Sequence, residues 1–179
     1  MGPIGHMVVS GAAGGAVYLA TGSPMAGAAT LGVGVLLDLD HVYDYYQWYV
    51  KGRRNKLYIW LHAWEYSAAG ILVLASVWYH PLLVAFVVGH LSHVTADHLH
   101  NRLVGFGYSL LYRLMVRFER VRIVTFDQAS YDNHWPRILQ PLRRLDLRME
   151  SRVRRWFKAR AKTGRPGTAD VVRSGRHQK

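Results

Sequence analysis

Long apolar stretches separated by short polar breaks run through the first hundred residues of the chain. Four of them stand out, at residues 4–20, 25–37, 59–79 and 81–99. The third is apolar on all faces and is about long enough to cross a bilayer as a single helix. The pattern therefore predicts an all-α protein, a polytopic membrane bundle of about four hydrophobic helices.

The polar breaks group these stretches into two helical hairpins. Residues 21–24 (Thr-Gly-Ser-Pro) and 79–81 (Tyr-His-Pro) contain the glycine and proline that are typical of turns. The first two stretches are rich in Gly and Ala, whose small side chains allow close helix contacts inside a bilayer. The second is short for a span unless its helix continues into residues 38–46. The alternative interpretation is a soluble all-α protein with buried helices.

Positive charge is distributed unevenly, and its distribution predicts an orientation. Of the 23 Lys and Arg residues, only Lys51, Arg53, Arg54 and Lys56 lie among residues 1–100. The others lie in the C-terminal part, and the two turns carry no charge. Because basic loops stay on the cytoplasmic side, four spans place both termini in the cytoplasm. We therefore expect a multi-pass protein of an inner (cytoplasmic) membrane.

The C-terminal part has an organisation of its own. Residues 103–118 are amphipathic and complete a membrane-embedded domain at residues 1–118. Residues 119–162 mix apolar side chains with many arginines, the pattern of a helix at a membrane interface. This basic, amphipathic, cytoplasmic tail predicts membrane lipids with anionic headgroups as partners. Residues 163–179 are expected to be disordered.

Histidine and acidic residues gather where this orientation places the cytoplasmic ends of the apolar stretches. His6 opens the first stretch, and the run at residues 38–44 (DLDHVYD) ends the second. His62 and Glu65 open the third, and the run at residues 90–100 (HLSHVTADHLH) ends the fourth. Ionisable groups beside apolar segments are costly and usually mark function. Because all of these groups fall at one depth on one side, we expect them to form a common site.

The spacing and chemistry of these residues suit a metal ion. His90, His93 and Asp97 recur at steps of three and four, so they share one face of a helix. The chain has no cysteine, and imidazole with carboxylate ligands favours a divalent transition metal, zinc first, with manganese or iron as alternatives. The number of candidate ligands allows one or two ions. The alternative for Asp38 and Asp40 is that they cap helices or pair with Arg53 and Arg54.

Two motifs resemble those of a known family. L-L-D-L-D-H (residues 36–41) resembles the L-P-D-x-D-H motif of the bacterial membrane-bound metal-dependent hydrolase family. G-H-L-S-H-V-T-A-D (residues 89–97) resembles that family's G-x-x-S-H-x-x-x-D helix, and His6 matches its early histidine. The family includes the LexA-regulated inner-membrane hydrolases and is distantly similar to zinc-dependent phospholipase C. The resemblance covers about residues 4–100 and implies a metal-dependent hydrolase of a phosphoester.

The third motif departs from the family pattern. L-H-A-W-E-Y-S (residues 61–67) stands where the family has H-R-x-x-T-H-S. Ser67 is kept, but Tyr66 replaces the second histidine, and the first histidine and the arginine are absent in register. His62 and Glu65 are the residues available in their place. Leu37 replaces the proline of the first motif. The departure in the third motif bears on whether this chain keeps the family's second metal and its phosphate-binding arginine.

The leading hypothesis is a membrane-embedded hydrolase of a phosphoester in a lipid or lipid-linked substrate at the cytoplasmic face. A carboxylate beside a metal can take a proton from water, so Glu65 is the candidate general base. Asp38 is a second catalytic candidate or a further ligand. The predicted metal ligands are His6, Asp40, His62, His90, His93 and Asp97.

Two other functions fit parts of the pattern. A non-enzymatic membrane protein that binds a metal for transport or structure would use similar ligands, but nearer the bilayer midplane. A membrane-tethered nucleic-acid-binding protein would use the Trp, Phe and Arg side chains of residues 152–160. Nucleic acid is the least favoured partner because it leaves the histidine and aspartate cluster unexplained.

Overall fold

The computed structural model describes residues 2–76, 78–101, 103, 105–124 and 140–163. Within these ranges the regular elements are all helices, which confirms the all-α fold class. The tail beyond residue 163, for which disorder was predicted, lies outside the described residues. Residues 125–139 of the predicted interfacial segment also lie outside them. The elements are α1 (Pro3–Thr21), α2 (Pro24–Leu36), α3 (Leu39–Tyr45), the π-helical turn η1 (Tyr46–Val50), α4 (Trp64–Ser76), α5 (Pro81–Asn101), α6 (Leu110–Met115), α7 (Arg120–Ile123) and α9 (Gln140–Thr163).

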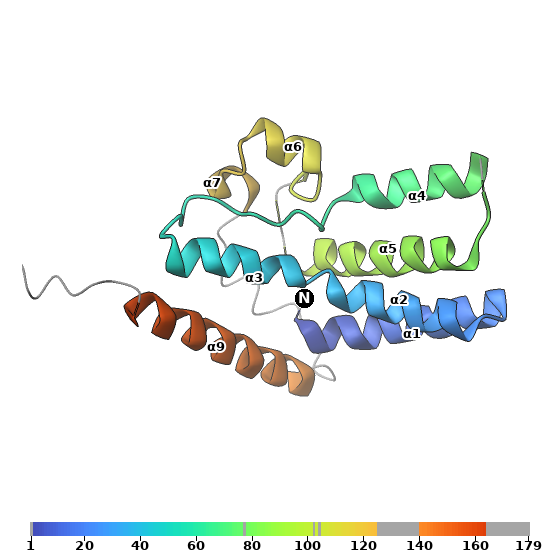
Figure 1. Cartoon of the computed structure of the whole chain (residues 1–179), viewed down its shortest axis with the longest axis horizontal. Coiled ribbons are helices and arrows are strands. Elements are labelled where there is room, and N and C mark those ends of the chain that lie inside the picture. Colours follow the sequence, from blue (N-terminus) through green and yellow to red (C-terminus); the bar gives the residue numbers. More distant parts are fainter. Residues whose placement is uncertain (1, 77, 102, 104, 125–139, 164–179) are drawn as a thin grey trace, which may run out of the picture.

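Helices α1, α2, α4 and α5 lie side by side as two hairpins (Figure 1). The first hairpin turns at Gly22, whose φ of +67° lies in the left-handed region that favours glycine. Ser23 then caps α2, because its hydroxyl accepts a hydrogen bond from the amide of Ala26 at 3.2 Å. The starts of α1 and α4 and the ends of α2 and α5 consequently lie at the same end of the bundle, where α3, α6, α7 and α9 gather (Figure 1).

Close backbone contacts hold α1, α2 and α5 together. A Cβ on Gly14 of α1 would lie 2.6 Å from the carbonyl oxygen of Gly27 in α2. A Cβ on Gly89 of α5 would lie 2.6 Å from the carbonyl oxygen of Thr30 in α2. The small residues that the sequence places in these stretches therefore set the distances between the helices.

The outer surface of the bundle carries its large apolar side chains. Leu19 is 83% exposed, Met25 is 68% exposed and Leu72 is 67% exposed, whereas glycine and alanine fill the buried contacts. Among the described residues, three helices are long and apolar enough to cross a membrane: α1, the continuous helix Pro24–Val50, and α5. An apolar exterior with a small-residue interior is the reverse of the usual soluble bundle.

Helix α2 runs on past its own end at Leu36, as a spanning length requires. Through α3 and the π-helical η1 it reaches Val50, 27 residues in all, with an irregular turn near its centre. There the amide of Asp38 bonds the carbonyl of Val35 at 3.4 Å, three residues back instead of four. The carbonyl of Gly34, which a regular helix would pair with that amide, is left for another partner.

In the third predicted span, residues 59–79, the described residues are helical over α4 alone, which has 13 residues. The segment before α4 makes backbone contacts outside a helix: the amide of Leu57 bonds the carbonyl of Phe118, and that of Trp64 bonds the carbonyl of Tyr108, both at 3.0 Å. A count of apolar residues does not distinguish such a segment from a helix. Spanning length is therefore found in three described helices, not in the four that were expected.

Helix α9 packs against the start of α1 and against η1 (Figure 1). Its buried Asp146 accepts a hydrogen bond from the amide of Ile4 at 2.8 Å. This carboxylate caps α1, whose own N-cap residue, Gly2, has no side chain for that purpose. Buried Phe157 lies against Tyr45 at 6.0 Å between ring centroids. One face of the basic helix thus contacts the protein, and its contact with lipid stays a prediction.

The substitution Gly14→Ala is expected to lower the free energy of unfolding by about 1–3 kcal/mol, because the added methyl meets a backbone carbonyl of α2. Gly15→Ala is the matched control: nothing lies within 4 Å of a Cβ there, and alanine favours the helix by up to about 1 kcal/mol. The thermal unfolding midpoints of both variants in detergent measure the difference. Equal midpoints would contradict the backbone contact between α1 and α2.

Candidate metal centre

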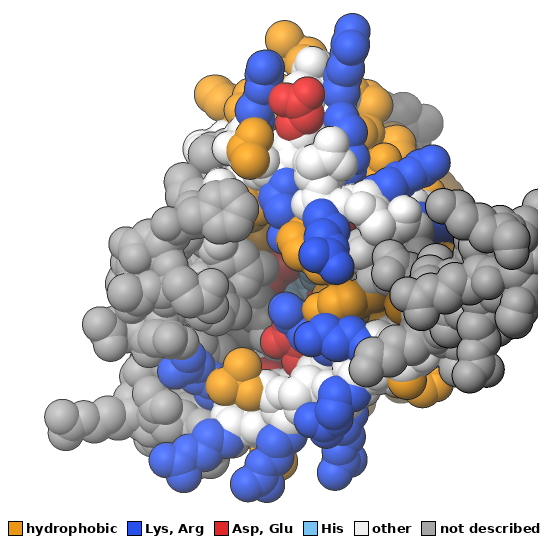
Figure 2. All heavy atoms as spheres, turned by 90° about the vertical axis from the view of Figure 1, so that its left-hand side faces the viewer, with side chains coloured by type: hydrophobic (Ala, Val, Ile, Leu, Met, Phe, Trp, Pro, Cys, Tyr) orange, Lys and Arg blue, Asp and Glu red, His pale blue; other side chains and the backbone are white. Residues whose placement is uncertain are grey.

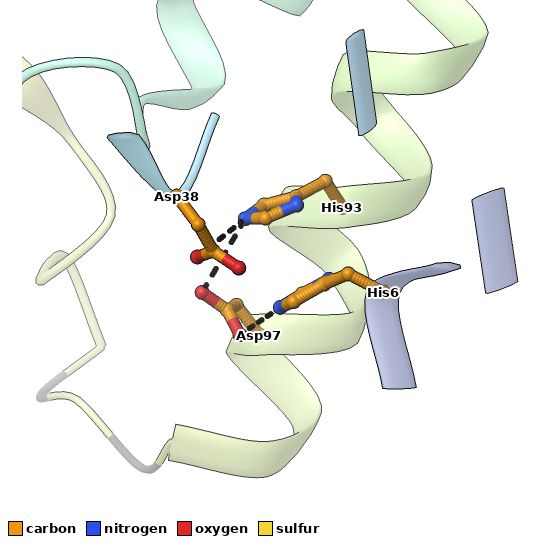
Figure 3. Close-up of side chains that lie close together, drawn as sticks. All are labelled: His6, Asp38, His93 and Asp97. Carbon is orange, nitrogen blue, oxygen red and sulfur yellow. Dashed lines mark hydrogen bonds and ion pairs between the residues drawn. The ribbon is translucent and has the colours of Figure 1, made fainter. Parts of the chain in front are cut away.

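Six histidine and aspartate side chains from four segments converge at one end of the bundle. Their ligand atoms form two groups of four, and within each group all atoms lie within 4.8 Å of one another. Figure 3 shows the first group, whose side chains point toward one another from α1, the α2–α3 junction and α5. The first group is His6, Asp38, His93 and Asp97; the second is Asp38, His41, His62 and Asp97.

Asp97 on α5 belongs to both groups and contacts an imidazole in each. Its Oδ1 lies 3.0 Å from Nε2 of His6. Its Oδ2 lies 3.4 Å from Nε2 of His62 and 3.8 Å from Nε2 of His93. The Nε2 atoms of His62 and His93 also face each other at 2.9 Å. Ligand atoms from three segments thus converge around one fully buried carboxylate.

Asp38 is the second shared carboxylate. Its Oδ1 lies 3.5 Å from Nε2 of His41, 3.6 Å from that of His62 and 3.7 Å from that of His93. Both of its oxygens are shielded from solvent and make no hydrogen bond to the part of the chain that the structure describes. A shielded carboxylate costs free energy unless a cation or a donor satisfies it. Imidazole nitrogen and carboxylate oxygen without thiolate therefore form a donor set that fits a zinc-like divalent ion.

The irregular turn between α2 and α3 orients His93. The carbonyl of Gly34, which has no partner in the helix because of this turn, accepts a hydrogen bond from Nδ1 of His93 at 2.5 Å. Because a carbonyl can only accept, Nδ1 carries the proton and the neutral ring presents its Nε2 lone pair to the cluster. Glycine is needed here because a Cβ would overlap the hydroxyl of Ser10.

Asp40 orients His62 from behind. Its Oδ2 lies 3.0 Å from Nδ1 of His62 and accepts the amide of Leu61 at 2.9 Å. A carboxylate on the far nitrogen fixes the tautomer of a metal-binding histidine and raises its basicity. Asp40, predicted as a ligand, thus lies outside both groups and contacts one of their members.

A buried arginine holds the backbone that carries His62. Arg113 of α6 is fully buried, and its guanidinium donates to the carbonyls of Ile59 and His62, the latter at 2.6 Å. Burial lowers the pKa of Arg113, because its charge is removed from water, while the nearby Asp40 carboxylate opposes the shift. Helix α6 therefore helps to position a ligand of the centre.

Of the other predicted ligands, His6, His62, His93 and Asp97 are brought together, but His90 belongs to neither group. Both of its ring nitrogens are already used: Nδ1 lies 2.7 Å from the hydroxyl of Ser67, and Nε2 lies 2.9 Å from the carbonyl of Leu61. Through its contact with the Leu61 carbonyl, His90 therefore helps to hold the segment before His62 in position.

Glu65, the predicted general base, also belongs to neither group. Its Oε1 accepts hydrogen bonds from the hydroxyl of Ser109 at 2.6 Å and from the amide of Leu111 at 3.1 Å. These contacts join the start of α4 to the start of α6, where an acceptor stabilises the helix end. The geometry therefore supports a structural role for Glu65.

Sequence reasoning missed His41. Its Nε2 approaches Asp38 from three residues along the same helix, and its ring lies 5.0 Å from that of His62. The signal was present in the D-L-D-H run, because residues three apart lie on one face of a helix. It was passed over in favour of Asp40, which points away from the cluster toward the far side of His62.

A pocket of about 390 Å³ connects this cluster with the surface. Asp38 and His41 form part of its wall, together with residues of α3, α7 and α9. Figure 2 looks onto this end of the molecule: Lys and Arg side chains surround a hollow in whose depth acidic and histidine side chains are visible. The three arginines in the pocket wall are Arg120, Arg143 and Arg154.

Comparisons with known proteins find no match, whether to protein-family models, to curated proteins or to solved structures.

Asp97→Ala is expected to abolish metal binding, because it removes a carboxylate common to both groups. His98→Gln is the matched control, since the exposed neighbour on the same helix belongs to neither group. Elemental mass spectrometry of detergent-purified protein, after reloading with zinc, measures the bound metal. Equal metal in the parent and in Asp97→Ala would contradict this centre.

Metal affinity is expected to rise with pH. His62 lies outside the helices that are long enough to span a membrane. Burial opposes its charge, but the nearby carboxylates of Asp38 and Asp40 outweigh burial and raise the pKa of His62 to about 9. A metal must displace this proton, so below that pH the affinity should fall by up to about tenfold per pH unit.

Chelator competition with zinc between about pH 6 and pH 8 measures this dependence. Asp40→Asn removes the negative charge behind His62, and should therefore flatten the pH dependence while lowering the affinity by about 10–100-fold. An unchanged slope in Asp40→Asn would contradict the proposed protonation of His62.

Proposed function

We propose that this protein is a membrane-embedded, metal-dependent hydrolase that cleaves a phosphoester of a lipid or lipid-linked substrate. The observation that carries the proposal is the pair of buried ligand groups that share Asp38 and Asp97. The reaction class and the lipid substrate come from the motif resemblance at residues 36–41 and 89–97. The open pocket beside the cluster gives a substrate access to it.

The shared carboxylates favour two metal ions. His6 and His93 would hold one ion with Asp38 and Asp97, and His41 and His62 would hold the other. When bound, such ions acidify a water molecule and neutralise charge on the phosphoryl oxygens. Zinc is the first candidate, because imidazole and carboxylate are its usual ligands in catalytic sites.

The surrounding residues then have separate tasks. Asp40 and the Gly34 carbonyl keep His62 and His93 in the tautomers that present Nε2 to the cluster. Asp38 lies in the pocket wall, so it would hold the ions on the side that a substrate can reach. Glu65, held by Ser109, has no part in this proposal.

The membrane placement rests on three helices of spanning length and on their exposed large apolar side chains. The basic loop at 51–56 and the basic C-terminal part support a cytoplasmic side for the metal centre and both termini. The pocket then opens toward headgroups, where anionic lipids meet the arginines of α9.

Zinc-loaded parent protein in mixed micelles is expected to release phosphate or a phosphorylated headgroup from phospholipids. Asp97→Ala should lose at least about a thousandfold in rate, because it loses the metal, and His98→Gln should retain the parent rate. Phosphorus NMR of the micelles measures the products. Full zinc occupancy without turnover of any phosphoester would overturn the hydrolase and favour a metal-binding protein without enzymatic activity.

A further inference from the structure

One arginine in the pocket wall combines a fixed position with unused hydrogen-bonding capacity. Arg120 stands at the start of α7, and its backbone amide bonds the carbonyl of Asn55 at 2.9 Å. Its guanidinium lies over the ring of Trp48, 4.2 Å from the ring centroid, and its Nη2 lies 3.3 Å from Oδ2 of Asp44. Its Nε is buried and finds no hydrogen-bond partner in the described part of the chain. Arg120 is thus held in place while its Nε–H has no acceptor among the described residues.

The other two arginines in the wall are engaged differently. Arg154 directs both Nε and Nη2 at one carboxylate, that of Glu150, and lies over the ring of Tyr45. Arg143 takes part in contacts of its own. Arg120 is therefore the arginine of the wall whose guanidinium is held by a ring contact and an ion pair while its Nε has no hydrogen-bond partner among the described residues.

The charge of Arg120 is also incompletely compensated. Burial lowers the pKa of Arg120, because its charge is partly removed from water, and the Asp44 carboxylate opposes that shift. The contact with Asp44 at 3.3 Å is long for a charge-assisted hydrogen bond. Asp44 also accepts the amide of Tyr58 at 2.9 Å, so its negative charge is shared between two donors.

We propose that Arg120 binds a phosphate oxygen of the substrate in the pocket beside the metal centre. This inference rests on the proposed function, whose phosphoester would bring an anion next to Asp38 and His41. A guanidinium that is already stacked and desolvated binds a phosphate oxygen with little further loss of conformational entropy.

The test measures phosphate binding by the zinc-loaded, full-length protein in detergent, using isothermal titration with inorganic phosphate. Arg120→Gln is expected to weaken binding by about 10–100-fold, the usual loss for a hydrogen bond to a charged group. Arg122→Gln is the matched control: this neighbour on α7 is 61% exposed, pairs with Glu119 and does not line the pocket. Its affinity should equal that of the parent.

Two further variants separate binding from folding. Arg120→Lys keeps the charge but loses Nε, and it should recover only part of the affinity. Asp44→Asn breaks the ion pair but leaves the guanidinium, so phosphate should bind as tightly as in the parent, or more tightly. If Asp44→Asn weakens phosphate binding as much as Arg120→Gln, the pair is structural and the proposal is overturned.

A second titration with short-chain phosphatidic acid in the same micelles identifies the source of the phosphate. Equal losses in Arg120→Gln with both probes support recognition of phosphate whatever carries it, and a loss with the lipid alone supports recognition of a headgroup. No loss with either probe overturns the role of Arg120. Zinc content, measured in each variant, is expected to equal that of the parent, so failure of this inference is distinguished from failure of the metal centre.

Discussion

The carboxylates of Asp38 and Asp97 are shielded from water among four imidazoles, and the surrounding structure must compensate their negative charge. Two desolvated anions repel each other and lack water to solvate them, so a cation between them contributes both attraction and structural order. The neighbours reduce the remaining freedom: a backbone carbonyl fixes one imidazole and a third carboxylate fixes another. Such pre-organisation limits how far the ligands must move to bind an ion.

The ligands are supported in two different ways. His6, His93 and Asp97 stand on helices α1 and α5, whose packing with α2 is set by glycine backbones in contact. His62 stands on a non-helical segment, which is held in place by hydrogen bonds that its carbonyls accept from Arg113 and His90 and that its Leu61 amide donates to Asp40. The first support is steric and tolerates little added volume. The second is polar and depends on each partner being present.

Sequence reasoning located the helical hairpins and the end of the bundle at which the polar residues meet, because apolar length and turn residues are local properties. It misjudged which acid faces the cluster. Positions two apart on a helix point about 200° apart, so Asp38 and Asp40 cannot both face it, and the irregular turn at Asp38 decides between them. The structural contacts of His90 and Glu65 depend on partners more than twenty residues away, which spacing alone does not reveal.

The shortness of α4 has a mechanical consequence for a surrounding bilayer. Thirteen residues rise about 20 Å as a helix, whereas the hydrocarbon core is about 30 Å thick. In the bilayer that we propose for this protein, lipids that border α4 would have to compress or tilt, so that the leaflet would be thinner there than beside α1 and α5. Such thinning would bring headgroups toward the level of His62, just before α4, and would shorten the distance that the polar part of a lipid must move to reach the pocket.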